Sequence, residues 1–167
     1  MFYKGKKIKV AVVGCGRISE RHFSAINQLS EHINIEAIWD PEIHKLKNIN
    51  KTLYEELHKS DKLGYPIKVF SDYEDLLEEC KLGRLYLELI ILCTPSGLHP
   101  NQAIKAGKLG INVCTEKPLA TSLEDGINLI NFFEKNSNPN LFVVLQNRLN
   151  PTVKLLRKQI DSGRFGK

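Results

Sequence analysis

The stretch Ile8-Lys9-Val10-Ala11-Val12-Val13-Gly14-Cys15-Gly16-Arg17-Ile18-Ser19 decides the fold that this sequence predicts. An apolar run typical of a buried strand ends on a Gly-x-Gly turn, and apolar residues at helical spacing follow at once. A dinucleotide pyrophosphate needs this order, because Gly14 permits a tight turn and Gly16 lets backbone N–H groups approach the phosphates. The helix that starts near Arg17 directs its positive end at the anion. We therefore expect pyrophosphate contacts from Gly14, Gly16, Arg17 and Ile18, although Ser19 stands where a third glycine is usual.

The bulk composition is that of one globular domain of ordinary size. The chain has 167 residues, of which 42% are hydrophobic and 26% charged. The formal charge of +5 comes from scattered lysines and arginines, which favours a solvated surface over nucleic-acid binding. No apolar run approaches the roughly 20 residues that a membrane span needs, and nothing like a signal peptide precedes the first strand. We expect a cytoplasmic protein that binds neither membrane nor nucleic acid.

The cysteines and histidines give no sign of a disulfide framework or a metal site. The four cysteines show no CxxC pairing, and the five histidines form no HxxxH or HxH cluster. Cys93 and Cys114 end apolar runs and are typical of buried, reduced thiols. The sequence predicts no bound metal.

Predicted strands and helices alternate along the whole chain. We expect strands at residues 8–13, 33–39, 67–70, 85–93, 111–115 and 141–145, and helices at 18–29, 42–61, 71–80, 103–109, 122–135 and 151–161. Ser71 and Glu74 form a capping box for the third helix, and residues 94–100 are too rich in Pro and Gly to be helical. In the last helix, Val153, Leu156 and Ile160 should point inward. This order predicts an α/β fold, a Rossmann-type doubly wound parallel sheet of about six strands.

The carboxyl ends of parallel strands share one edge of a sheet, and ligands bind beyond that edge. Each unusual segment of this sequence falls at such an end: residues 14–18, 40, 94–99, 116–118 and 146–148. We expect these segments to line one crevice.

Asp40 ends the second predicted strand, where a ribose would lie. Its carboxylate can accept hydrogen bonds from both adenosine ribose hydroxyls and would repel a 2′-phosphate, which favours NAD over NADP. The alternative is that Asp40 only starts a turn before Pro41.

Lys117 is the candidate catalytic residue. It closes a strand between Glu116 and Pro118, and the proline restricts its backbone to extended or turn geometry, with the cis or trans state left open. Its ammonium could hydrogen-bond a reacting hydroxyl, stabilise developing alkoxide charge as hydride leaves, and share in proton transfer if partly desolvated. The alternative is a surface lysine in a turn.

Five further positions belong to the cofactor side of the predicted crevice. Thr94 and Pro95 would lie near the adenosine ribose or the nicotinamide by position alone. His99 could cap the following helix, contact the nicotinamide ribose, or be an ordinary loop histidine. Glu116 and Gln146 lie at the ends of the fifth and sixth strands.

Asn147 and Arg148 are the candidates for substrate binding beside Lys117. A guanidinium suits a phosphate or a carboxylate, so Arg148 could bind an anionic substrate. The alternative is a solvated arginine at a strand end.

Three motifs resemble the N-terminal half of the Gfo/Idh/MocA oxidoreductase family. They are Val12-Val13-Gly14-Cys15-Gly16-Arg17-Ile18, Thr94-Pro95-Ser96-Gly97-Leu98-His99 and the highly specific Glu116-Lys117-Pro118-Leu119-Ala120. The resemblance covers essentially the whole chain. It implies a tightly held NAD and a lysine, Lys117, near the sugar that is oxidised.

Other segments are similar to a narrower group within the family, the bacterial enzymes that oxidise UDP-N-acetylglucosaminuronate at C3 for surface polysaccharides. These segments are residues 96–100, 115–118, 124–126, 142–144 and 146–148. The likeness implies nucleotide-sugar chemistry in the cytoplasm, with 2-oxoglutarate re-oxidising the cofactor in some members. Two alternatives stay open: a dehydrogenase of a simple sugar or polyol, and a non-catalytic NAD-binding module.

Members of the family continue into a second α+β domain, which carries a catalytic histidine and an aspartate and forms the oligomer interface. This chain ends at Arg164-Phe165-Gly166-Lys167, where that domain should begin. We therefore expect residues 1–167 to be a dinucleotide-binding domain without its substrate domain. It should be inactive alone, and the full-length form should be a homo-oligomer.

Overall fold

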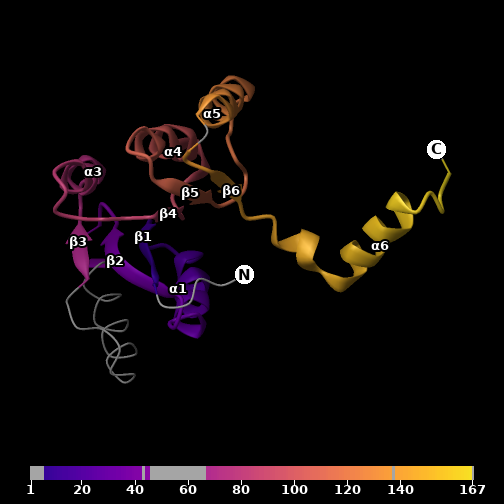
Figure 1. The fold of residues 1–167 in the computed structure, drawn as a ribbon, viewed down its shortest axis with the longest axis horizontal. Helices are drawn as coiled ribbons and strands as arrows, with labels where there is room; N and C mark the ends of the chain where they lie inside the picture. The colour runs from indigo at the N-terminus through magenta and orange to yellow at the C-terminus, as the bar shows by residue number, and fades with distance from the viewer. Residues whose placement is uncertain (1–5, 43, 46–66, 137, 167) are drawn as a thin grey trace.

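A six-stranded, fully parallel sheet forms the centre of the structure (Figure 1). The computed structural model describes residues 6–42, 44–45, 67–136 and 138–166. The strand order is β3-β2-β1-β4-β5-β6. The strands are β1 Ile8–Val13, β2 Ile33–Trp39, β3 Lys68–Phe70, β4 Leu89–Leu92, β5 Asn112–Thr115 and β6 Leu141–Val143. The predicted Rossmann-type fold is confirmed.

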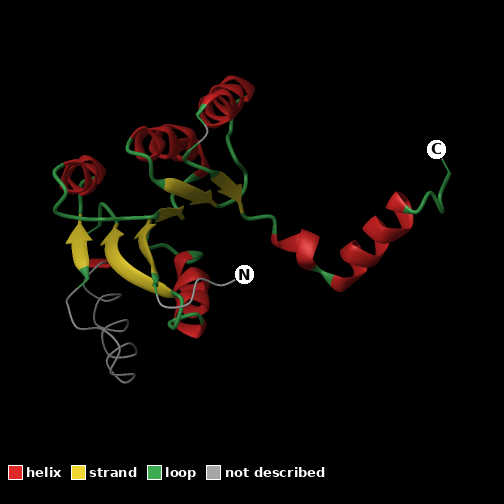
Figure 2. Ribbon diagram, in the orientation of Figure 1, coloured by secondary structure: helices red, strands yellow, loops and turns green. Residues whose placement is uncertain are grey.

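Helices cover both faces of the sheet (Figure 2). The covering helices are α1 Ser19–Gln28, α3 Tyr73–Lys81, α4 His99–Lys108 and α5 Leu123–Lys135. The chain also forms α6 Pro151–Asp161 and the short 3₁₀ turns η1 Ser96–Leu98 and η2 Gln146–Leu149. Alternate residues of β1 enter different cores: Ala11 and Val13 pack under α3, α4 and α5, whereas Val10 and Val12 pack under α1. A central strand buried on both faces explains why residues 10–13 of β1 are continuously apolar.

Several local predictions need correction, and one lies outside the described residues. The helix expected at 42–61 falls mainly in the part that the structure does not describe. The strand expected at 85–93 begins only at Leu89, although Leu85 and Leu87 are buried. Asp72, not Ser71, caps α3, and its side chain accepts a hydrogen bond from the Glu74 N–H at 2.8 Å.

The segment after β4 is more helical than its composition predicts. Residues 96–98 form η1, and α4 begins at His99 with Pro100 in its first turn. Proline is tolerated there because the first N–H groups of a helix have no partner within the helix.

The C-terminal arm, defined as residues 144–166, leads away from the sheet and carries α6 (Figure 1). Val153, Leu156 and Ile160 are 39%, 51% and 53% exposed, so the prediction that they point inward is wrong. The apolar stripe of α6 exists, but α6 contacts η2 of the same arm and lies away from the sheet (Figure 1). No helix among the described residues is long and apolar enough to cross a bilayer.

Candidate functional site

The glycine turn after β1 joins three strands at the carboxyl edge of the sheet. Gly14 has φ +96°, and a Cβ there would lie 2.8 Å from the Cys93 carbonyl carbon and 2.9 Å from the Thr94 nitrogen. Its N–H donates to the Trp39 carbonyl at 2.8 Å. Only glycine fits this position, because it must adopt a left-handed conformation and also lie against the backbone that follows β4.

The start of α1 offers both space and donors for an anion. A Cβ on Gly16 would meet nothing within 4 Å. The backbone N–H groups of Gly16, Arg17 and Ile18 donate to no acceptor within the part of the chain that the structure describes. The Ser19 hydroxyl and N–H both donate to the Gly16 carbonyl, at 2.6 Å and 3.0 Å, and so fix the turn. These features fit a dinucleotide pyrophosphate.

Asp40 lies beside this turn and is 5% exposed. One carboxylate oxygen accepts from the Cys15 N–H at 2.8 Å, and the other accepts from the Glu42 N–H at 2.9 Å. Each oxygen keeps acceptor capacity for a ribose hydroxyl. The turn at Pro41 that the sequence offered as an alternative role for Asp40 is thus present. It still leaves the Asp40 carboxylate able to accept a hydrogen bond from a ribose. Burial, followed by the nearby Asp40 charge, raises the pKa of the Cys15 thiol to about 12.

The loop after β4 is tied down by buried polar contacts. The Thr94 hydroxyl donates to the Gln102 side-chain oxygen at 2.6 Å, while Pro95 is exposed. His99 is fully buried, with its Nε2 2.8 Å from the Thr94 carbonyl oxygen and its Nδ1 3.0 Å from the Pro118 carbonyl oxygen. A neutral imidazole can donate to one of these oxygens and a protonated one to both. The ring therefore connects two loops.

The segment after β5 presents Lys117 between two anchored residues. Glu116 is 7% exposed, and its Oε1 lies 2.8 Å from the His22 Nε2. The Glu116 Oε2 accepts from the Lys117 N–H at 3.3 Å, while Lys117 itself is exposed. The Lys117–Pro118 peptide bond is cis, which settles the question that the sequence left open.

The Glu116 carboxylate also affects the cysteines on the neighbouring strands. Burial is the main cause that raises the pKa of the Cys93 and Cys114 thiols, and the Glu116 charge raises both further. The ends of β4 and β5 therefore hold one carboxylate beside two neutral thiols. All four cysteines of the described residues are free.

Gln146, Asn147 and Arg148 lie apart from this group. They are exposed in η2, at the start of the C-terminal arm, where the Arg148 N–H donates to the Leu145 carbonyl at 2.9 Å. Within the described residues their side chains form no hydrogen bond or ion pair with the glycine turn, Asp40 or Lys117. The structure thus joins the candidates at the ends of β1, β2, β4 and β5, and leaves those after β6 separate.

Sequence reasoning missed two polar residues that support the site, His22 and Gln102. A signal was available for His22, because it follows Ile18 by four residues and so shares the sheet-facing side of α1. Gln102 likewise follows His99 by three residues on α4. A polar residue at an apolar-face position predicts a buried partner, but the sequence does not say which one.

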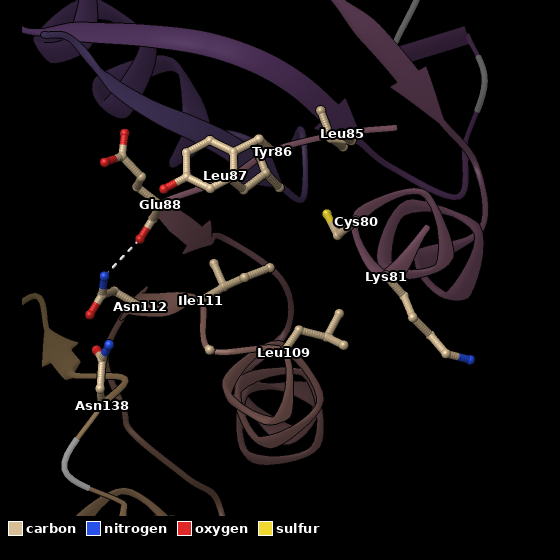
Figure 3. Close-up of a pocket in the computed structure, with 11 residues that line it drawn as sticks. Cys80, Lys81, Leu85, Tyr86, Leu87, Glu88, Leu109, Ile111, Asn112 and Asn138 are labelled. Carbon is tan, nitrogen blue, oxygen red and sulfur yellow. Dashed lines mark hydrogen bonds between the residues drawn. The ribbon is translucent and has the colours of Figure 1, made fainter. Parts of the chain in front are cut away.

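A cavity of about 520 Å³ lies at the opposite edge of the sheet, where β4 and β5 begin (Figure 3). The Asn112 amide donates to the Glu88 carbonyl at 2.8 Å, and its oxygen accepts from the Asn140 N–H at 2.9 Å. These polar groups serve the backbone rather than a ligand. No group of three or more His, Cys, Asp or Glu in the described part could hold a metal ion.

Comparison with known proteins agrees with this geometry. The profile of the Gfo/Idh/MocA family, described as "Oxidoreductase family, NAD-binding Rossmann fold", matches residues 8–144. The chain belongs to this family. The predicted NAD-binding domain is therefore confirmed, and the predicted class, an oxidoreductase, is the class that describes the family.

Two solved structures of similar proteins carry bound ligands. The WlbA dehydrogenase from Chromobacterium violaceum, in complex with NADH and UDP-GlcNAcA, is 33% identical, with a TM-score of 0.82 over 98% of this chain and 42% of that one. The WlbA dehydrogenase from Bordetella pertussis, with the same ligands, is 35% identical, with a TM-score of 0.81 over 97% of this chain and 44% of that one.

Among curated relatives, an inositol 2-dehydrogenase from Corynebacterium glutamicum is 24% identical over 96% of this chain and 43% of its own length. The chain spans less than half the length of the curated relatives that it matches.

Proposed function

We propose that this chain is the NAD-binding part of a dehydrogenase that oxidises the C3 hydroxyl of a UDP-N-acetylaminouronic acid to a ketone. The observation that carries the proposal is the likeness to WlbA dehydrogenases, at 33% and 35% identity over nearly the whole chain. The family motif Glu116-Lys117-Pro118 supports it, because it presents an exposed lysine at the strand edge where the glycine turn lies.

The bound NAD would supply the hydride acceptor. The N–H groups of Gly16, Arg17 and Ile18 bind its pyrophosphate, and Asp40 accepts a hydrogen bond from a ribose hydroxyl. We also assign Thr94, Pro95, Glu116 and Gln146 to the cofactor side of the site, with Gln146 contributed by η2, apart from the other three. His99 contributes by fixing the loop after β4, since its ring is enclosed between two carbonyl oxygens.

Lys117 acts on the sugar. Its side chain hydrogen-bonds the reacting hydroxyl, stabilises the negative charge that develops on that oxygen as hydride leaves, and shares in the transfer of the hydroxyl proton. Asn147 and Arg148 bind the anionic part of the substrate, since a guanidinium pairs well with phosphate or carboxylate.

The same proposal extends to the whole protein. It acts in the cytoplasm on nucleotide sugars for surface polysaccharides, its full-length form is a homo-oligomer, and 2-oxoglutarate can re-oxidise the bound cofactor. The 167-residue chain alone binds NADH but produces none from a sugar.

The second candidate is a dehydrogenase of a simple sugar or polyol, which the inositol 2-dehydrogenase relatives favour. A non-catalytic NAD-binding module is the third. The three candidate functions differ in the ligand that Arg148 binds and in whether turnover requires Lys117.

A substrate panel on the protein expressed from the complete gene tests the proposal. Reduction of NAD should occur with the UDP-linked uronic acid and not with the same sugar lacking UDP or with inositol. Lys117→Ala should lower kcat by about a hundredfold or more while NADH affinity stays within about twofold. Turnover of inositol alone would support the second candidate, and turnover unchanged by Lys117→Ala would reject the assigned role of the lysine.

A further inference from the structure

Two histidines from different helices contact the residues on either side of Lys117. His22, on α1, pairs with the Glu116 side chain at 2.8 Å. His99, the first residue of α4, lies 3.0 Å from the Pro118 carbonyl oxygen. Lys117 has an exposed side chain, yet the backbone on each side of it is fixed from within the fold.

The His22–Glu116 pair has the geometry of a strong contact rather than a surface ion pair. The two side chains are 17% and 9% exposed, and the second Glu116 oxygen accepts from the Lys117 N–H. A buried carboxylate without its partner is costly, so the fold favours one position of Glu116 while His22 is present. That position in turn sets the direction of the Lys117 backbone.

The same helix serves the cofactor end of the site. His22 lies one helical turn after Ile18, the N-cap residue of α1, which follows the open space at Gly16 by two residues. A shift of α1 toward a bound pyrophosphate would therefore move the partner of Glu116 as well. The glycine turn is thus connected to Lys117 through two side chains, His22 and Glu116.

We propose that His22, assisted by His99, is a positioning residue for Lys117 and couples the pyrophosphate end of α1 to the lysine. This rests on the proposed function, in which Lys117 contacts the reacting hydroxyl. His22 does not touch the substrate and acts through Glu116. Its loss should therefore lower kcat and leave the affinity for the cofactor nearly unchanged.

The deciding experiment uses the 167-residue chain and does not require activity. Lysines are reductively methylated with ¹³C-formaldehyde, and the Lys117 dimethylamine signal is assigned with Lys117→Arg. In the wild-type chain, NADH should shift this signal. His22→Leu should shift it in the free chain and abolish its response to NADH, whereas His22→Gln, which keeps an N–H donor, should preserve most of the response.

His44→Leu is the matched control. His44 also pairs with a glutamate, Glu42, at 3.4 Å, but its side chain is 71% exposed, so the Lys117 signal should not change. NADH binding and the melting temperature are recorded for every variant, and His22→Gln carries the test if His22→Leu fails to fold. An unchanged Lys117 signal and NADH response in folded His22→Leu would overturn the proposal.

Turnover by the protein from the complete gene separates this proposal from the proposed function. There His22→Leu should lower kcat by about tenfold to a hundredfold, with the KM for NAD within about twofold, and His22→Gln should recover most of the loss. Absence of any sugar-dependent turnover in the wild type would reject the proposed function, while the Lys117 signal would still decide the positioning role.

Discussion

The carboxyl edge of β1, β4 and β5 and the C-terminal arm are built in opposite ways. At the edge, Gly14 lies against the backbone after β4, and buried side chains of Asp40, His99 and Glu116 each make defined hydrogen bonds. On the arm, Leu156 and its apolar neighbours on α6 are exposed. The cofactor half of the candidate site is thus formed by packing within this chain. Asn147 and Arg148, in contrast, lie on the C-terminal arm, which leads away from the sheet (Figure 1).

Gly14→Ala should break the edge most severely. The new methyl would meet the Cys93 and Thr94 backbone at 2.8–2.9 Å in a left-handed conformation, so both overlap and strain oppose it. We expect a loss of about 2–5 kcal/mol in the free energy of unfolding, measured by urea denaturation. Gly110→Ala is the matched control: Gly110 has φ +75° but open space around it, so its loss should be about 1 kcal/mol. Equal losses in the two variants would show that overlap with the backbone after β4 does not contribute to the destabilisation by Gly14→Ala.

Gly16→Ala should affect binding but not folding. Nothing lies within 4 Å of its Cβ, so the free energy of unfolding should change by less than about 1 kcal/mol. The methyl would occupy space that a pyrophosphate needs, and NADH affinity should fall by about tenfold or more in a fluorescence titration. If the variant binds NADH as tightly as the wild type, the pyrophosphate does not bind at this turn.

Alkaline pH should lower the free energy of unfolding, because burial raises the pKa of several groups in the folded chain. Burial is the main cause that raises the pKa of Cys15 from 9.0 to about 12 and that of Cys80 from 9.0 to about 11, and it also raises the pKa of the Tyr73 phenol. A raised pKa in the folded state gives stability that is complete below the unfolded value and is lost as pH rises above it. The urea midpoint should therefore fall as pH rises from about 9 toward about 11. Cys15→Ala should flatten this dependence, and an unchanged slope would mean that Cys15 does not contribute to it.

The sequence predicted most of the edge because local rules determine it. A continuous apolar run, a glycine pair and a helical period are enough to place β1, the turn and α1. The partners of His22 and His99 were beyond reach, since residue pairs 94 and 19 positions apart in the chain meet only through the strand order. Periodicity also identified the apolar stripe of α6 correctly, but a stripe does not reveal which surface covers it.

Polar substitutions on α6 should have the smallest effect. In the 167-residue chain, Leu156→Gln and Ile160→Gln should each change the free energy of unfolding by less than about 0.5 kcal/mol, because both side chains are about half exposed. Leu76→Ala, at a fully buried position of α3, is the contrast and should cost about 2–5 kcal/mol. A loss of more than about 1 kcal/mol from either glutamine variant would indicate that α6 packs on the sheet in solution.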